Sequence, residues 1–119
     1  MVKQSDMVIK PDPKKIQASA HGFIQDYVLP TEDVGISYQQ YDGRAPDKGY
    51  WVNTVCWEAY YVIDGSATIY GDDKAYSVEK GDVFIMLPGQ KIRMIAKKLK
   101  IITITKPNWF ASQAKIVSK

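Results

Sequence analysis

Apolar and polar residues alternate along most of the chain in short runs, and turn residues separate the runs. Alternation with a period of two is typical of β-strands that bury one face. The runs that predict strands are residues 21–29, 35–42, 50–58, 59–63, 66–70, 75–78, 83–87, 91–96 and 99–105. They follow each other without an intervening helical pattern, which predicts an all-β sandwich or barrel.

Turn residues mark the ends of most of these runs. Asp64-Gly65 is a dipeptide typical of tight hairpin turns, and Pro88-Gly89 interrupts a strand pattern. Lysines at 97, 98 and 100 predict a solvated turn between the last two strands, and Pro107 ends the final strand. The sequence therefore predicts a barrel over residues 21–107, an N-terminal arm over residues 1–20, and a tail over residues 108–119 that packs on the barrel.

Several predicted strands are apolar on both faces. In the run 58–63, Tyr60 and Val62 share one face, whereas Ala59, Tyr61 and Ile63 share the other. The barrel interior can cover only one of these faces. A second sheet or a partner subunit must cover the other, so we expect a homodimer.

Composition limits the class of protein. A chain of 119 residues with 45% hydrophobic residues fits one globular domain. Cys56 is the single cysteine, which excludes an internal disulfide and fits a reducing compartment. No apolar run is long enough for a signal peptide or a membrane span, so we expect a cytoplasmic protein without a membrane partner. The net charge is +3 and the lysines are scattered, which argues against a nucleic-acid partner.

One residue does not fit the strand pattern. Glu58 lies within WVNTVCWEAYYVIDG, a run rich in aromatic and β-branched residues. Glu58 precedes Gly65 by seven positions, and Gly81-Asp82 and Pro88-Gly89 follow at short distances. EAYYVIDGSATIYG followed by YSVEKGDVFIMLPG resembles, in order and spacing, the two motifs of a small single-domain cupin. The resemblance covers about residues 35–107 and implies a double-stranded β-helix, or jelly-roll barrel.

The metal-binding residues of that family are not matched. The resemblance places its first-motif histidines at Val52 and Thr54 and its second-motif histidine at Arg93. Valine has no donor atom, and a guanidinium repels a cation. Glu58 is then the one remaining ligand position, and we expect neither a metal nor another cofactor.

The family positions imply that Arg93 and Glu58 both face the barrel interior. We consider two interpretations: a purely structural ion pair, and a cavity that binds a small polar molecule. A nearby guanidinium would keep the carboxylate ionised, whereas a buried carboxyl without a partner has a raised pKa.

Other residues share the predicted inward face. Thr54, Cys56 and Tyr60 have the same parity as Glu58, and we expect Tyr38 and Gln40 to line the same cavity. Glu58 and Tyr60 are the candidate catalytic pair, and Arg93, Thr54, Tyr38, Gln40 and Cys56 are the candidate ligand-binding residues. The single histidine, His21, is a further candidate base at the barrel rim.

The sequence therefore predicts a metal-independent cupin-type protein that binds a small anion or sugar-like molecule in its barrel. One alternative is a metal-independent isomerase, epimerase or lyase in which Glu58 acts as acid or base. Another is a non-catalytic interaction or regulatory module whose surface includes Trp109 and Phe110. No motif decides whether the protein is an enzyme, because a fold does not determine a function.

Overall fold

The structure is a computed structural model and describes residues 7–118. Nine strands and one short 3-10 helix make up this part of the chain. The strands are β1 (Lys15–Ser19), β2 (Gly22–Tyr27), β3 (Gly35–Ala45), β4 (Tyr50–Asn53), β5 (Trp57–Tyr70), β6 (Ala75–Glu79), β7 (Val83–Met86), β8 (Lys91–Lys106) and β9 (Ala114–Val117); the 3-10 helix spans Ala111–Gln113.

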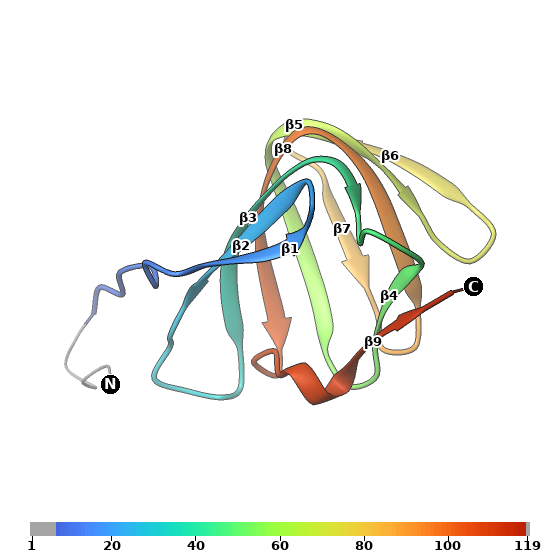
Figure 1. Ribbon diagram of the computed structural model, residues 1–119. Coiled ribbons are helices and arrows are strands. Elements are labelled where there is room, and N and C mark those ends of the chain that lie inside the picture. Colours follow the sequence, from blue (N-terminus) through green and yellow to red (C-terminus); the bar gives the residue numbers. More distant parts are fainter. Residues whose placement is uncertain (1–6, 119) are drawn as a thin grey trace.

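Three long strands form the centre of the sheet. β8 lies between β3 and β5 and pairs with both in antiparallel orientation. β1 and β2 continue the sheet beyond β3, whereas β6 and β7 pair with the two ends of β5. The sheet curls around its own inner face (Figure 1), and this face holds the hydrophobic core.

Two of the predicted turns are bends within continuous strands. Asp64-Gly65 does not end a strand, since β5 runs from Trp57 to Tyr70, and the lysine cluster lies inside β8. The pairing of β5 with β8 shifts register at this point, and both Gly65 and Lys98 have a positive φ, of 78° and 47° respectively. A β-bulge can need the same left-handed backbone conformation as a tight turn. An Asp-Gly dipeptide is therefore compatible with a hairpin turn and with a bulge inside a strand.

The bulges also change which residues face inward. In β5 the buried residues are Tyr60 and Val62 before the bulge but Ala67 and Ile69 after it. In β8 the even positions 92, 94 and 96 are buried before Lys98, and the odd positions 99, 101, 103 and 105 after it. One extra residue in a strand reverses the parity of every later side chain.

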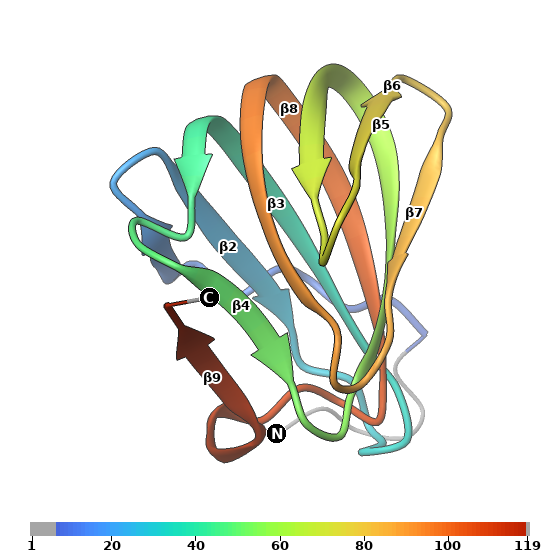
Figure 2. The same ribbon diagram turned by 90° about the vertical axis from the view of Figure 1, so that its right-hand side faces the viewer.

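A second, smaller layer crosses the open side of the curled sheet. β4 and β9 pair in antiparallel orientation, and β4 also pairs with the first residues of β8 (Figure 2). Trp51 on β4 packs edge-on against Tyr41 on β3, with ring centroids 6.1 Å apart. The β4–β9 pair therefore faces β3 across the interior and closes part of the barrel.

Residues 15–19 were expected in an arm but form β1, which pairs with β2. The first six residues of that predicted arm lie outside the described residues. The predicted tail contains the 3-10 helix and β9, which pairs with β4. Across residues 7–118 there is no helix that is both long and apolar enough to cross a membrane.

Candidate functional site

Glu58 lies near the start of β5, on its inner face. Its strand neighbours are Thr105 on β8 and Met86 on β7, and both of these side chains are buried. The inward orientation follows from the strand period, because Tyr60 and Val62 on the same face belong to the core. The predicted inward position of Glu58 is therefore confirmed.

Two adjoining cavities meet at the Glu58 side chain. Each has a volume of about 220 Å³. Residues that line both are Ile16, Ile24, Gln39, Glu58 and Trp109. The first cavity extends between β3 and the β4–β9 pair, and its other lining residues include Tyr41, Trp51, Asn53, Tyr60 and Met86. The second extends toward Asp26, Ser37, Thr105 and Asn108.

The Glu58 carboxyl has an unusual acidity. Burial raises its pKa from 4.5 to about 7, and a hydrogen bond with the Asn53 side chain opposes part of this change. Among the described residues, no Lys, Arg or His lines either cavity, so no cation favours the ionised form. Glu58 can therefore exist in both protonation states near neutral pH.

Tyr60 holds the Glu58 carboxyl in place. Its hydroxyl donates a hydrogen bond to Oε2 of Glu58 and lies 3.7 Å from the Met86 sulfur. The Tyr60 ring stacks on Phe84, with centroids 4.4 Å apart and the planes 9° from parallel. Because the ring face and the hydroxyl are both held, the hydroxyl is a fixed donor beside the carboxyl.

A second polar network lies on the β3 side of the cavities. The Gln39 Nε2 donates to the Ser37 Oγ at 3.1 Å and the Thr103 Oγ1 at 2.9 Å. The Gln39 Oε1 accepts a 2.6 Å hydrogen bond from the Tyr41 hydroxyl. Burial, followed by the Glu58 charge, raises the pKa of Tyr41, so this hydroxyl keeps its proton. The network fixes the orientation of the Gln39 amide.

The C-terminal segment is attached to the site through Gln113. This buried side chain accepts hydrogen bonds from the backbone N–H groups of Val55 and Cys56, each at 3.1 Å, and donates to Asn53 at 3.0 Å. Asn53 in turn contacts Glu58. Gln113 thus links the segment that carries Trp109 to the loop before β5.

The structure does not bring Arg93 to Glu58. Arg93 pairs with Tyr70 at one end of the β5–β8 ladder, whereas Glu58 pairs with Thr105 at the other end. Its guanidinium lies 3.9 Å from the centroid of the Tyr70 ring. Ile92 and Met94 on either side are buried, so Arg93 faces outward. The predicted inward position of Arg93 is wrong because the alternation in this half of β8 places even residues inside.

Tyr38 and Gln40 also lie on the outer face, so the prediction that they line the cavity is wrong. Within β3 the buried side chains are at positions 37, 39 and 41, and the strand period places 38 and 40 opposite them. The Gln40 Nε2 donates to the Tyr38 hydroxyl at 2.7 Å, and Tyr38 packs near Phe23. Ser37, Gln39 and Tyr41 take the expected positions instead.

The remaining predicted residues, Thr54, Cys56 and His21, line neither cavity. Thr54 is exposed, because the chain leaves the strand pattern after β4, and its hydroxyl donates to the Gln113 backbone oxygen at 2.7 Å. Cys56 is fully buried, and burial and the Glu58 charge raise its thiol pKa, which disfavours the nucleophilic thiolate. His21 is exposed in the turn between β1 and β2 and lines neither cavity.

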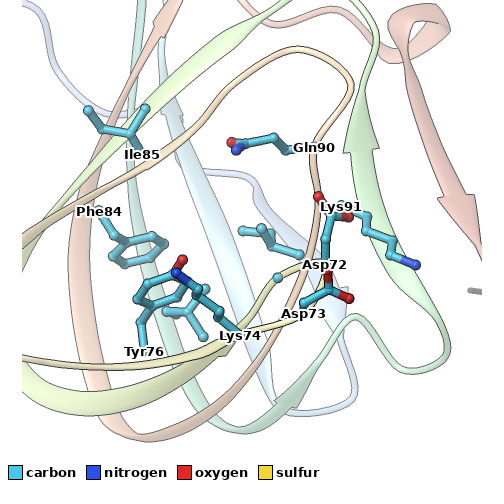
Figure 3. A pocket seen from close by; sticks show the side chains of 11 residues that line it. Asp72, Asp73, Lys74, Tyr76, Phe84, Ile85, Gln90 and Lys91 are labelled. Atoms are coloured by element: carbon cyan, nitrogen blue, oxygen red, sulfur yellow. The ribbon is translucent and has the colours of Figure 1, made fainter.

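A larger hollow lies elsewhere on the surface. It measures about 400 Å³ and lies between the β5–β6 turn and the β7–β8 loop. Its lining includes Asp72, Asp73 and Lys74 from the first of these segments and Gln90 and Lys91 from the second, all labelled in Figure 3. The side chains of 72–74 and Gln90 are exposed, and none of the predicted site residues lines it. The Glu58 cavities are the better candidate because they enclose buried polar groups.

The donor atoms around Glu58 do not fit the metal site of a cupin. Val52 lines the first cavity without a donor atom, and Arg93 faces away. Within residues 7–118 there is no cluster of three or more His, Cys, Asp or Glu side chains that could hold a metal ion. A carboxyl beside a tyrosine and two amides is instead suited to hydrogen bonding and proton transfer.

No protein-family model and no curated protein matches the sequence. Solved structures do match the fold. A Streptomyces Pac13 structure with uridine has a TM-score of 0.78 at 12% identity and covers 87% of this chain and 83% of its own. KdgF from Halomonas has a TM-score of 0.65 at 13% identity, with 81% and 87% covered.

A third similar structure is a conserved Klebsiella pneumoniae protein described by its double-stranded β-helix domain. Its TM-score is 0.68 at 18% identity, and the match covers 84% of this chain and 82% of that one. At such low identity these likenesses establish the fold and not the activity. The chain has the small cupin-type double-stranded β-helix fold that its two motifs predicted.

Proposed function

We propose that the protein binds a small, neutral, polar organic molecule in the two cavities that meet at Glu58. The observation that carries this proposal is a hydrogen-bonded carboxyl that faces a cavity without a cationic partner. Together the cavities reach the lower end of the range of about 300–1,000 Å³ typical of small-molecule sites. Apolar walls with a few converging polar groups are also typical of such sites.

The lining favours a neutral ligand over an anion. Glu58 and Asp26 both border the cavities, and no described lining residue is basic. An anion would meet these carboxyls without a compensating charge, which costs binding free energy. A sugar-like molecule, in contrast, offers hydroxyl groups that donate to carboxylate and amide oxygens.

Acid–base catalysis is the second candidate function. The specific observation in its favour is the Glu58 pKa of about 7, which lies in the range where a carboxyl can both accept and donate a proton. Such a group, with the Tyr60 hydroxyl beside it, suits a metal-independent isomerase, epimerase or lyase. Pac13 is described as a nucleoside dehydratase. At 13% identity that description is a reason to test a nucleoside, not an assignment.

Binding can be tested by titrating the isotopically labelled protein with uridine and with D-glucose in an NMR experiment. We expect at least one of them to shift the amide signals of residues around Glu58 and the indole signal of Trp109. The Glu58→Gln variant should bind with altered affinity, and EDTA should leave the affinity of the wild type unchanged. If neither compound shifts these signals, binding of a neutral hydroxylated molecule in these cavities is contradicted.

We also propose that the outer face of the sheet is the interface of a homodimer. Exposed apolar side chains on three neighbouring strands adjoin there: Tyr61 on β5, Val83 and Ile85 on β7, and Ile104 on β8. The strand register places them in two rows across the sheet. One row contains Val83 and Tyr61, and the other contains Ile85 and Ile104 with Ala59 between them. Because this patch carries no charge, a second copy of the same patch is a suitable partner.

Light scattering coupled to size exclusion tests the dimer. We expect the wild type to have twice the monomer mass and the Ile85→Lys variant to be a monomer, because burial of a lysine in an apolar interface is unfavourable. Ile116→Lys on β9 is the matched control, since both isoleucines are 57% exposed and only Ile85 belongs to the patch. A monomeric wild type would contradict the proposed dimer.

A further inference from the structure

The orientation of the buried Gln113 amide is fixed by the backbone. Gln113 is 2% exposed, and its Oε1 accepts hydrogen bonds from the backbone N–H groups of Val55 and Cys56, each at 3.1 Å. A backbone N–H group can only donate, so the atom of Gln113 that faces these two groups must be its oxygen. The NH₂ group of Gln113 is therefore turned the other way, toward Asn53.

The orientation of Gln113 determines that of Asn53. The Gln113 Nε2 donates a hydrogen bond to the Asn53 Oδ1 at 3.0 Å. Because an amide NH₂ group donates and does not accept, Asn53 can present only its oxygen to Gln113. Asn53 is 3% exposed, and its backbone pairs with Ala114, the residue directly after Gln113. The Asn53 Nδ2 is thus directed away from Gln113.

The Asn53 Nδ2 lies beside Glu58. It is 3.8 Å from the sulfur of Met86, and Met86 is the strand neighbour of Glu58. The Tyr60 hydroxyl, which donates to Glu58, lies 3.7 Å from the same sulfur. Asn53 and Glu58 line the same cavity, and their side chains form a hydrogen bond. Since the Asn53 oxygen faces Gln113, this hydrogen bond is donated by Nδ2 and accepted by the carboxyl.

We propose that Gln113 is a positioning residue that keeps Asn53 a hydrogen-bond donor to Glu58. This arrangement, from Gln113 through Asn53, is an amide relay. In the ionised form the carboxylate accepts hydrogen bonds from both Asn53 and Tyr60. In the neutral form Asn53 cannot turn its oxygen toward the acid proton, because two NH₂ groups would then face each other. The relay therefore favours the ionised form. The inference rests on the proposed function for the role of Glu58 at the ligand.

Hydrogen-bond donors are important at this site because no cation of the described chain faces Glu58. The titratable groups around it are Tyr60 on the same strand, Tyr41 on β3, Asp26 on β2 and Cys56 before β5. None of these groups can carry a positive charge, and no described Lys, Arg or His lines either cavity. The amide relay and the Tyr60 hydroxyl therefore take the place of a cation in stabilising the carboxylate.

A carbon-13 NMR titration of the Glu58 carboxyl tests the relay without a ligand. Asn53→Leu should raise the midpoint from about 7 to about 8, because it removes a hydrogen bond to the ionised form. Gln113→Met should raise it by about half a pH unit, because a released Asn53 amide can turn and accept the acid proton. Gln90→Met is the matched control: Gln90 also accepts a backbone hydrogen bond, from Leu87, and its loss should leave the midpoint unchanged.

The effect of Gln113→Met should vanish when Asn53→Leu is already present, since Gln113 acts through Asn53. An unchanged midpoint in Gln113→Met, or an equal effect in both backgrounds, would overturn the relay and leave the proposed function standing. If the variants do not fold, the wild type decides: the side-chain amide proton signals of Asn53 should change with the midpoint of Glu58, and signals independent of pH would overturn the relay. Failure of uridine and D-glucose to bind would contradict the proposed function alone.

Discussion

The Glu58→Gln variant is expected to be more stable than the wild type above pH 7, by about 3 kcal/mol. Burial raises the pKa of Glu58 from 4.5 to about 7, so the folded protein resists ionisation of this carboxyl. A tenfold change in an acid dissociation constant corresponds to about 1.4 kcal/mol of free energy. Glutamine is neutral at every pH, nearly the same size, and still offers an oxygen that accepts the Tyr60 hydroxyl hydrogen bond.

The sign of the pH dependence follows from proton binding in the two states. Below pH 4.5 both the folded and the unfolded protein carry the proton, and the carboxyl has no effect on the pH dependence. Between pH 4.5 and about 7 the unfolded state loses the proton first, so the folded state binds more protons and loses stability as the pH rises. Above about pH 7 both states are ionised and the loss is complete.

Urea unfolding at pH 4.5 and at pH 8 measures this effect. The difference in unfolding free energy between the two pH values should be about 3 kcal/mol smaller in Glu58→Gln than in the wild type. Glu32→Gln, a change of an exposed carboxyl, serves as the control and should leave the wild-type pH dependence unaltered. A Glu58→Gln variant that is several kcal/mol less stable at pH 8 would indicate that a cation stabilises the carboxylate.

Gln113→Ala is expected to destabilise the protein by about 3 kcal/mol or more. The substitution removes the acceptor of the Val55 and Cys56 backbone N–H groups and the donor to Asn53. Cys56 and Asn53 are buried, and each buried group left without a partner costs about 1–3 kcal/mol, whereas Val55 is exposed and water can replace part of its loss. We also expect weaker ligand binding, because Gln113 links the segment that carries Trp109 to the loop before β5.

Gln90→Ala is a matched control for this prediction. The Gln90 Oε1 also accepts a backbone hydrogen bond, from Leu87 at 2.8 Å, but Gln90 is exposed. Water can replace its side chain there, so the loss should be about 1 kcal/mol or less. Equal losses for the two variants in chemical unfolding would show that burial of Gln113 is not the source of its contribution.

The sequence was sufficient to predict most of the fold. Alternation located the strands, and the two motifs around Glu58 and Gly81-Asp82 predicted the barrel type that the solved structures match. The bulges were not predictable from local sequence, because Asp64-Gly65 is compatible with both a turn and a bulge. The bulge at Lys98 also affected the prediction of the site. It exchanges the inner and outer faces of β8, so the side chains that face inward could not be predicted on both sides of it.

The candidate site was less predictable than the fold. Glu58 and Tyr60 were found because a carboxyl in an apolar strand is unusual and Tyr60 shares its face. Arg93 was misplaced because a motif alignment tolerates a one-residue shift that reverses the face of a strand. Gln39 and Thr105 could be assigned to the inner face only after the structure showed which positions of β3 and β8 face inward. Trp109 lines the cavities beside Glu58, and Gln113 reaches Asn53, through contacts between distant parts of the chain that a local sequence pattern does not contain.

The proposed function depends above all on Glu58 being a carboxyl without a cationic partner, beside Tyr60 in a ligand cavity. An NMR titration of the carbon-13-labelled Glu58 side-chain carboxyl measures this property at the residue itself. We expect a midpoint at about pH 7. A midpoint at or below the ordinary glutamate value of 4.5 would contradict the proposal, because such a carboxyl would be solvated or paired with a cation.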